Sequence, residues 1–383
     1  MRFPEFSGEW KEEQLDSIAT LSKGVGISKE QLSEVGEPCI LYGELYTKYK
    51  SEIIKQIESK TDIDCSKLKR SKANDVIIPC SGETAVDIAT ARCVPFDNIL
   101  FGGDLNVISL HKYDGAFMSY QLNGKRKYDI ARVAQGVSVV HLYGDHLKAI
   151  KTYNPTLPEQ QKIAKLLSLL DERIATQNKI IEDLNKLKSA IIEMEYTHKT
   201  KGNTHIGDFI EQTSKRNKDS AIQNVLSVSN SQGFIQQCEQ FENRNVASDD
   251  ISNYKIVERN CFAFNPARIN VGSIARLTTF NRGIVSPMYI CFRTKDNLFP
   301  EYLDYYFESK QFFTEIQKRL EGSVRQCLSY EGLCNIPLCI PTVEVQQQTG
   351  KRLSTLVQEI KLEIDFLELL QKQKKFLLHQ MFI

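Results

Sequence analysis

Apolar residues recur along residues 154–195 at gaps that alternate between four and three. This spacing is typical of the narrow seam of a coiled coil and differs from the broader apolar stripe of an ordinary surface helix. Pro158 suits the first turn of a helix, where its missing N–H costs nothing, and Glu159 favours the positive end of the helix dipole. The pattern predicts one long helix that needs a partner helix. Its seam consists of Ile163, Leu167, Leu170, Ile174, Ile181, Leu184 and Ile191.

The partner is predicted at the end of the chain, because residues 341–383 repeat the first helix after a shift of 186 positions, which takes Pro155 to Pro341. The same shift takes Gly136 to Gly322 and Leu142 to Leu328. The repeated unit is therefore a globular domain followed by a long helix, which suggests an approximate two-fold axis and an antiparallel helix pair with the domains at its opposite ends. The second seam consists of Leu353, Leu356, Ile360, Leu367, Leu370 and Leu377.

The regions around the two helices have an α+β pattern. Short, β-branched, turn-bounded stretches predict strands, and two segments of the first domain together with one of the second predict helices. We expect a first globular domain at 1–153, a central helix at 154–201, a second globular domain at 202–340 and a C-terminal helix at 341–383. The predicted strands are 38–42, 75–78, 105–108, 224–229, 254–257, 261–264 and 288–292, and the predicted helices are 28–32, 114–122 and 300–320.

Composition narrows the function without deciding it. Of 383 residues, 41% are hydrophobic and 25% are charged, as in ordinary globular proteins. The net charge of +1 is too small for a protein that holds nucleic acid by overall charge, so any basic surface must be local. No apolar run is long enough to span a membrane, and the first ten residues lack the apolar core of a signal peptide. We therefore expect a cytoplasmic protein that does not contact a membrane.

Motifs of catalysis and metal binding are missing from the sequence. The ten cysteines form no Cys-x-x-Cys pair and no zinc-like spacing with histidine, so we expect reduced thiols and no metal. No phosphate-binding loop of the Gly-x4-Gly-Lys-Ser/Thr type is present. Asn265-Pro266-Ala267 lacks the second proline and the aromatic residue of the amino-methyltransferase motif, and Ser81 is not in a Gly-x-Ser-x-Gly context. We expect no catalytic residue and no cofactor bound by this chain.

Five segments together resemble the specificity subunit of type I restriction-modification enzymes. In chain order they are RFPEFSGEW, CSGETAVDIATA, LPEQQKIAKLLSLLDERI, FNPARINVGSIARL with GIVSPMYICF, and LEGSVRQCLSYEGLCNIPLCIP. Each is weak alone, but their order and repetition cover essentially the full chain. The second repeat departs from the first in two places: Glu344 stands where Pro158 does, and Gly350 where Ala164 does, at a cost of up to about 1 kcal/mol in helix propensity. These departures put in doubt how well the second helix begins.

The resemblance implies a function and a set of partners. Each globular domain would be a target-recognition domain that reads one half of a split, asymmetric site in double-stranded DNA. The helices would set the spacing between the half-sites and dock two modification (methyltransferase) subunits through their seam residues. Restriction subunits would join that complex, and AdoMet, ATP and Mg²⁺ would bind to the partner subunits.

Polar residues in the predicted loops are the candidates for contact with DNA. Arg268 can fork onto guanine, a carboxylate such as Glu83 can accept from cytosine N4, and Lys125 with Arg126 can hold phosphates. For each of them a solvated loop is the competing interpretation, and Asn270 could instead cap a turn. The candidates are Tyr42, Glu44, Tyr46, Ser81, Glu83, Thr84, Lys125, Arg126 and Ser138 in the first domain, and Ser227, Ser229, Asn230, Gln232, Arg268, Asn270, Ser323 and Arg325 in the second.

Two other functions remain open on the sequence. A self-contained methyltransferase or nuclease is disfavoured by the missing motifs, and binding of AdoMet to the chain alone would support it. A scaffold that does not bind DNA would also fit two β-rich modules on a coiled coil. It would be favoured if the reconstituted complex selected no DNA sequence.

Overall fold

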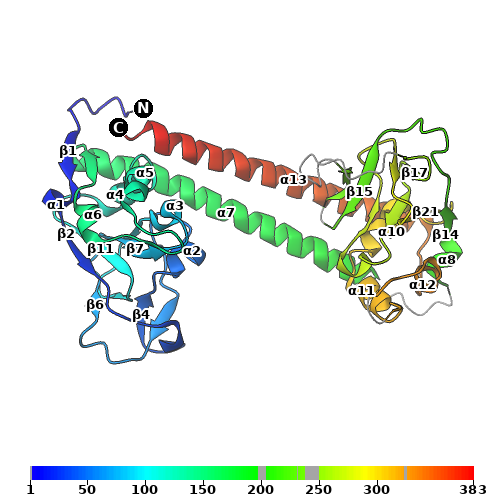
Figure 1. The fold of residues 1–383 in the computed structure, drawn as a ribbon, viewed down its shortest axis with the longest axis horizontal. Coiled ribbons are helices and arrows are strands. Elements are labelled where there is room, and N and C mark those ends of the chain that lie inside the picture. Colours follow the sequence, from blue (N-terminus) through cyan, green and yellow to red (C-terminus); the bar gives the residue numbers. More distant parts are fainter. Residues whose placement is uncertain (1, 197–203, 231, 238–249, 323–325) are drawn as a thin grey trace. The chain divides into compact units, whose positions relative to one another are not determined.

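The computed structural model describes residues 2–196, 204–230, 232–237, 250–322 and 326–383. By packing, the chain divides into two compact units. The first contains residues 1–179 and 364–383, and the second contains residues 180–363. The division passes through both long helices, so each unit combines one globular region with a part of each helix (Figure 1). No described helix is both long and apolar enough to cross a membrane.

The two long helices are α7 (Leu157–Tyr196) and α13 (Val343–Gln380). In the first unit, Ile163 and Leu167 near the start of α7 pack against Met381 and Phe382, just beyond the end of α13. In the second unit, Ile192 near the end of α7 shares a core with Leu353 near the start of α13. The start of each helix thus lies against the end of the other, so the pair is antiparallel, as the repeat predicts.

The seam is also where the sequence places it. All the predicted seam positions of both helices are buried or half-buried. Several apolar residues that the heptad pattern excludes, among them Ile180, Leu187 and Leu369, are exposed, whereas Ile192 is buried against the second globular region. Burial of the seam rather than of every apolar residue explains why the chain forms a pair of helices with narrow contact faces.

Two main sheets and a pair of polar edge strands build the globular region of the first unit. One sheet has the order β2-β11-β7-β9, all antiparallel, and Val107 of its central strand lies opposite Ile77. The second has the order β3-β5-β4-β10-β6, and β1 pairs with β13. The strands are β1 Lys11–Gln14, β2 Ala19–Lys23, β3 Leu32–Ser33, β4 Glu37–Ile40, β5 Ser59–Thr61, β6 Lys69–Arg70, β7 Asp75–Pro79, β8 Ser81–Gly82, β9 Arg92–Val94, β10 Leu100–Phe101, β11 Leu105–Leu110, β12 Val140–His141 and β13 Lys151–Asn154.

Short helices cover the sheets of this unit. The longest of them, α4, has a buried face with Phe117, Met118 and Tyr120, which join the sheets to α7. The helices are α1 Leu15–Ile18, α2 Glu44–Thr47, α3 Ala85–Ile88, α4 Gly115–Asn123, α5 Lys127–Val133 and α6 Gly144–Lys148, with a single 3-10 turn, η1 Lys29–Gln31. The helix predicted at 28–32 is therefore only this turn.

The second unit has two four-stranded sheets, with the orders β14-β21-β18-β19 and β16-β15-β20-β17. The predicted helix at 300–320 is wrong in one respect, because it is two helices: the first ends at Tyr306, and Ser309 caps the second by accepting from Phe312 N. The elements are α8 Ile206–Phe209, β14 Ile210–Thr213, β15 Val225–Ser229, β16 Gly233–Gln236, β17 Lys255–Glu258, β18 Phe262–Phe264, η2 Ile269–Val271, β19 Ile274–Arg276, β20 Arg282–Val285, β21 Ile290–Thr294, α10 Pro300–Tyr306, α11 Lys310–Gln317 and α12 Tyr330–Cys334.

The two units repeat the same hydrogen bonds at the same shift of 186. Leu142 N donates to Cys80 O at 2.8 Å, and Leu328 N donates to Pro266 O at 3.0 Å. Gln160 Oε1 accepts from Asp114 N, just before α4, and Gln346 Oε1 accepts from Phe299 N, just before α10, so the acceptors follow the shift of 186 and the donor differs by one residue. Both glutamine side chains also donate to a proline carbonyl five residues back. The predicted tandem repeat is therefore a repeat of structure.

Gly350 has a structural reason to differ from Ala164. It is buried in α13, and a Cβ added there would lie 3.2 Å from Glu301 Cβ. The loss of helix propensity thus accompanies a close approach between α13 and α10. The doubt about the start of the second helix is resolved, since α13 begins at Val343 and Gln346 N donates to Thr342 O.

Candidate nucleic-acid interface

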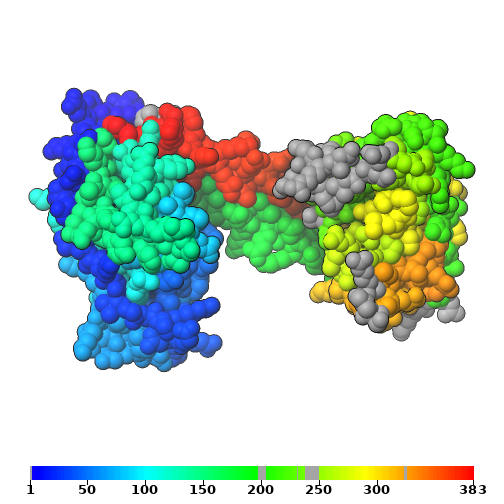
Figure 2. Space-filling view, viewed as in Figure 1, coloured from blue at the N-terminus to red at the C-terminus, as the bar shows by residue number. Residues whose placement is uncertain are grey.

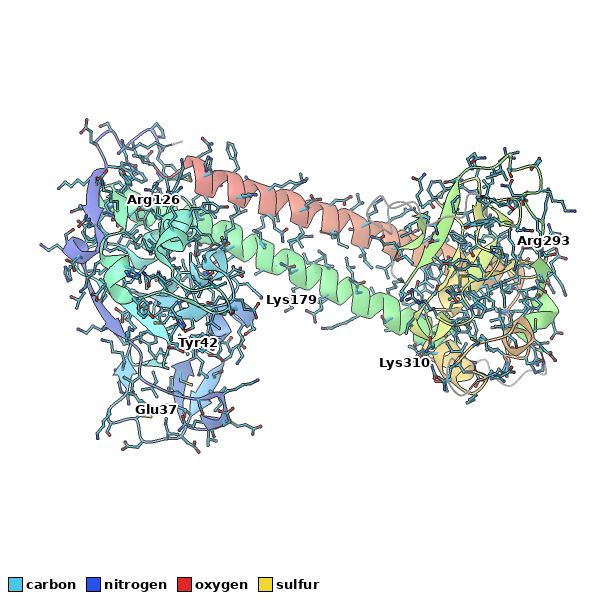
Figure 3. The ribbon with its side chains drawn as sticks, in the orientation of Figure 1. Glu37, Tyr42, Arg126, Lys179, Arg293 and Lys310 are labelled. Carbon is cyan, nitrogen blue, oxygen red and sulfur yellow. The ribbon has the colours of Figure 1, made fainter. Side chains whose placement is uncertain are left out.

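A surface cavity of about 750 Å³ in the first unit gathers residues that the sequence predicts to contact DNA. Its lining includes Tyr42, Tyr46, Ser81, Glu83 and Ser138, which come from three separate parts of the chain. Tyr42, Glu83 and Ser138 are exposed, and Figure 3 labels Tyr42 in this region. The cavity thus presents hydroxyl, aromatic and carboxylate groups together, which is the side-chain chemistry that reads base edges and stacks on bases.

Local packing holds this cavity in shape. Tyr46 donates its hydroxyl to Ser81 O at 2.9 Å, which ties α2 to β8. Burial raises the pKa of Tyr46, so the phenol stays a neutral donor. Ser81 and Gly82 pair with His141 and Val140 in the small β8–β12 sheet, which brings the segment around Ser138 beside them.

Gly82 and Thr84 shape the loop that follows β8. A Cβ at residue 82 would lie only 3.0 Å from the Tyr46 hydroxyl, so glycine permits the close approach. Thr84 is exposed and caps α3, because its Oγ1 accepts from Asp87 N at 3.1 Å and donates to Asp87 Oδ2 at 2.6 Å. Thr84 therefore has a structural role in addition to its predicted contact with DNA.

Glu44 requires a correction, because its side chain is buried and points into the protein. One carboxylate oxygen accepts from Leu41 N at 2.9 Å. The other accepts from the Ser59 hydroxyl and lies 2.7 Å from Lys48 Nζ. Both oxygens are occupied, so Glu44 fixes the position of α2 and is not part of the exposed surface.

The predicted phosphate clamp is also corrected. Arg126 lies over the ring of Tyr153 at 5.1 Å, and its guanidinium lies 3.3 Å from Asp129 and donates to Ile383 O at 3.3 Å. These contacts hold α5 to the end of the chain within the first unit (Figure 3). Lys125 beside it is half-buried. Arg126 is therefore engaged in packing and does not present a free charge.

In the second unit, the structure brings two predicted segments together at one end of β15. Arg268 and Asn270 lie on the turn that contains η2, which ends at Gly272 with a φ of 92°. A Cβ on Gly272 would be 3.5 Å from Asn230 O, so this turn lies beside the end of the β15–β16 hairpin. Arg268, Asn230 and Gln232 are exposed, whereas Ser229 and Asn270 are half-buried.

The alternative role of Asn270 as a turn cap is taken by another asparagine. Asn265 Oδ1 accepts from Ala267 N at 3.1 Å, and Asn265 O accepts from Arg268 N at 3.0 Å. Within the described ranges, the Asn270 side chain makes no hydrogen bond. Ser227 is corrected, because it is buried within β15 and cannot reach a ligand. Ser323 and Arg325 lie outside the described residues.

The two candidate clusters occupy equivalent places. The shift of 186 takes Gly82 to Arg268 and Thr84 to Asn270. The carbonyl at the start of each loop accepts the equivalent bond, from Leu142 in one unit and from Leu328 in the other. Each unit therefore presents one polar loop at the same point of the same fold, with different side chains on it.

Sequence reasoning missed two features of these surfaces. Arg92 lines the first cavity from below, held by bonds from its Nε to Tyr49 O and from its Nη1 to Ala91 O. No sequence motif predicts Arg92 as a site residue.

A second cavity, in the second unit, is lined by Lys215, Arg216, Lys218 and Arg282. Its only sequence signal is the short basic run at 215–218. No group of three potential metal ligands is found in the part of the chain that the structure describes.

Comparison with known proteins shows what the chain is similar to. Residues 7–186 match the family model described as the type I restriction modification DNA specificity domain. The match covers 180 of the 383 residues, a little under half of the chain, and shows what this part of the chain is similar to.

Individual proteins are also similar to this chain. The type I restriction enzyme MjaVIII specificity subunit of Methanocaldococcus jannaschii is 29% identical over 144 residues, which are 36% of this chain and 33% of that protein. The crystal structure of the type I system S subunit from M. genitalium matches with a TM-score of 0.62 at 17% identity, over 100% of this chain and 97% of that one.

A second solved chain comes from a structural study of complex assembly and conformational transition of the type I R-M system. It matches with a TM-score of 0.57 at 13% identity, over 98% and 97% of the two chains. At these identities the solved structures show the shared fold, and that fold extends over the whole of this chain.

Proposed function

We propose that the chain is the DNA sequence-recognition subunit of a type I restriction-modification complex, acting in the cytoplasm. Each unit reads one half of a bipartite, asymmetric site in double-stranded DNA. The observation that carries the proposal is the pair of equivalent polar loops, 80–84 and 266–270, which lie at the same point of a repeated fold with different side chains. Two copies of one reader with different contact residues suit a site whose halves differ in sequence.

The side chains on the two loops give each reader a chemistry. Arg268 is exposed and makes no ion pair with a described residue, so its guanidinium is available to fork onto guanine O6 and N7. Glu83 is exposed beside Ser81 in the first cavity and accepts hydrogen bonds only, which suits cytosine N4 or adenine N6. The two units therefore prefer different base edges.

We further propose that the helices dock two methyltransferase subunits and, through them, restriction subunits. Each helix has apolar residues outside the seam. In the second unit, Ile180, Leu187 and Met194 of α7 are spaced by seven residues and are 39%, 49% and 60% exposed. In the first unit, Leu369 and Phe376 of α13 are likewise spaced by seven and exposed. Parts of α7 and α13 are uncovered at the surface in Figure 2.

A second heptad stripe on a helix that already has a partner favours further helices packed alongside. The partner we commit to is the modification subunit of the same system. AdoMet, ATP and Mg²⁺ are then bound by the partner subunits, and this chain supplies the choice of DNA sequence. Replacing Leu187 and Met194 with Glu should prevent co-purification of the modification subunit. The control is Lys186→Glu on the same helix, at a polar position whose lysine pairs with Glu182, and it should leave co-purification intact.

The decisive experiment is expression with the modification subunit followed by mapping of methylated adenines across a genome. The expected result is one split motif. With Arg268→Ala, recognition should relax at one base of one half-site, at a cost of about 1–3 kcal/mol, while the other half-site stays the same. Arg293→Ala is the matched control, because Arg293 is an exposed arginine of the same unit that already pairs with Glu211. An unchanged motif in the Arg268 variant would rule out its assignment.

A further inference from the structure

A cavity of about 730 Å³ in the second unit concentrates positive charge away from the reading loop. Lys215, Arg216 and Lys218 approach it from the segment between β14 and β15, and Arg282 approaches it from the start of β20. Two carboxylates, those of Asp219 and Glu258, are the acidic groups of the lining. The cavity therefore has a positive balance in a chain whose net charge is only +1.

The four cations are not paired with an acidic side chain in the described part of the chain. None of them has a carboxylate oxygen within 4.0 Å among the residues that the structure describes. Arg216 donates only to the neutral Asn253 Oδ1, at 2.9 Å. By contrast, Arg276 of the same unit is paired with Glu301 and Asp304. Several unpaired cations around one hollow attract an anion more strongly than they do singly.

The basic segment is held in a fixed shape by Asn217, whose side chain is fully buried. Its Nδ2 donates to Ile222 O at 2.9 Å, and its Oδ1 accepts from Ile222 N at 3.1 Å. Its own backbone N donates to Tyr254 O, and Ile256 N donates to Lys215 O at 2.8 Å. The lysines and arginines on either side of Asn217 therefore start from an ordered backbone, which reduces the entropy lost when they bind a ligand.

The cavity lies at one part of the sheet β16-β15-β20-β17, and the hairpin beside the reading loop lies at another part of it. Asn230 follows the last residue of β15, at the hairpin with β16. The cavity lies at the other edge, beside β17, and at the other end, where Asn224 Nδ2 donates to Arg282 O before β15 begins. The strand rise places the two sites on the order of 20 Å apart, which is about six phosphate steps along one DNA strand.

We propose that this cavity binds phosphates of the DNA backbone that flank the half-site read by the second unit. It supplies affinity without sequence information, because phosphate contacts position a protein and base contacts specify the sequence. It also provides the local basic surface that the low net charge requires. The inference rests on the proposed function, and it assigns to four residues a task distinct from that of Arg268.

The test uses the complex assembled with its modification subunit and a duplex that contains the mapped motif with long flanks. The variant is Lys215→Gln, Lys218→Gln and Arg282→Gln together, on exposed side chains that make no contact needed for folding. Equilibrium binding is measured between 50 and 200 mM salt. The slope of log K against log salt should become less steep by about 0.9 per lost phosphate contact, thus by about 2–3. The methylated motif should stay the same.

Two controls fix the sign and the place of the effect. Glu258→Gln removes a negative charge from the same cavity and should strengthen binding. Arg293→Gln removes one already paired cation of the same unit and should leave the slope unchanged. On a duplex trimmed to the motif, the triple variant and the unaltered complex should bind alike. Melting of each complex checks that the variant is folded.

The outcomes separate the two proposals. If the unaltered complex selects no DNA sequence, the proposed function fails. If it reads its motif but the triple variant keeps the same salt slope on the long duplex, the phosphate site is wrong and the proposed function stands. If the triple variant changes the motif, the cavity contacts bases and the assignment to the backbone is overturned.

Discussion

Lys374 of α13 makes the most demanding prediction about stability. Its ammonium lies 2.5 Å from Glu52 Oε2 and 2.6 Å from Asp171 Oδ1, and the three side chains are 17%, 9% and 5% exposed. Asp171 also accepts from the Tyr120 hydroxyl at 2.6 Å. Burial raises the pKa of Glu52, and Lys374 opposes that rise. One lysine therefore pairs with two buried carboxylates where α13, α7 and the globular region meet.

Replacing Lys374 with Met keeps the volume and the apolar stem but leaves both carboxylates without their cation. Removal of one partner from a buried ion pair costs about 3–5 kcal/mol. We expect about 3 kcal/mol, because the positive charge of Arg92 also acts on Glu52 and offsets part of the loss. That is a large share of the roughly 5–15 kcal/mol that stabilises a typical domain.

The chain supplies its own reporter for this measurement. Trp10 is its one tryptophan, and it packs against Phe117 and Phe382 in the first unit, with ring centroids 5.8 and 6.4 Å apart. Urea unfolding followed by tryptophan fluorescence therefore reports on the unit that contains Lys374. The matched control is Lys372→Met, two residues away, whose exposed pair with Glu368 should contribute under about 0.5 kcal/mol.

A second substitution separates charge from packing. Adding Glu52→Gln to Lys374→Met should recover part of the loss, since the buried charge is gone, and the double-mutant cycle should give a coupling above about 1 kcal/mol. If Lys374→Met lies within about 0.5 kcal/mol of the unaltered chain, the buried cluster contributes nothing net and the reasoning is refuted.

The pH dependence of stability provides an independent test of the same cluster. In the Lys374→Met variant, the pKa of Glu52 rises further because the opposing cation is absent. The folded variant then binds a proton that the unfolded chain does not bind in the window above the ordinary glutamate pKa, so stability rises as the pH falls through that window. The deficit of the variant relative to the unaltered chain should therefore shrink between pH 8 and pH 5.5. A deficit that grows on acidification would contradict this account.

Three further predictions concern recognition. The first is an insertion of seven residues after Gln177 and seven after Glu363, which are equivalent points of the two helices. It lengthens the pair by about 10 Å, or about three base pairs. Methylome mapping should show a longer spacer and unchanged half-sites, and altered half-sites would mean that the helices do not set the spacer. Tyr46→Phe removes the bond to Ser81 O and should cost about 1 kcal/mol by urea unfolding, with relaxed recognition in the first half-site only. Thr84→Ala removes the cap of α3 and should lower the free energy of unfolding by about 1 kcal/mol. Thr20→Ala, at another exposed threonine, is the comparison, and a similar loss there would argue against capping as the cause.

The parts of the fold that the sequence predicts are those set by a local period. The heptad spacing of Ile163 and Leu167 identifies α7, and the repeat then identifies α13. The buried strands β7 and β11 carry β-branched runs and appear where predicted. The sequence does not predict the edge strands β1 and β13, because KEEQ and KTYN have little apolar alternation. These strands pair only when the two ends of the first domain meet.

The candidate site was predicted as loops but not as a cavity. Ser81 and Ser138 are far apart in sequence, and only the β8–β12 pairing places them together. Glu44 looks like an exposed turn residue, yet one turn of helix carries it inward to Ser59, a contact that no local pattern encodes. The short basic run at 215–218 does not by itself predict a site, because such a run usually marks only a solvated surface. The distinguishing feature is the absence of nearby carboxylates, which depends on the fold.

Lys188 and Lys374 each join a long helix to the globular region of one unit. They occupy equivalent positions in the two seams, where a heptad would place an apolar residue. Lys374 binds Glu52 and lies 5.9 Å from the Tyr120 ring, while Lys188 binds Glu308 at 2.6 Å and lies 5.9 Å from the Tyr305 ring. In each unit a seam lysine thus joins a helix to the globular region of that unit, and Lys374 also joins α13 to Asp171 of α7. Because both readers are fixed to the helices in this way, a change in helix length should change the spacer, and a change in either lysine should loosen the hold on the half-site of its own unit.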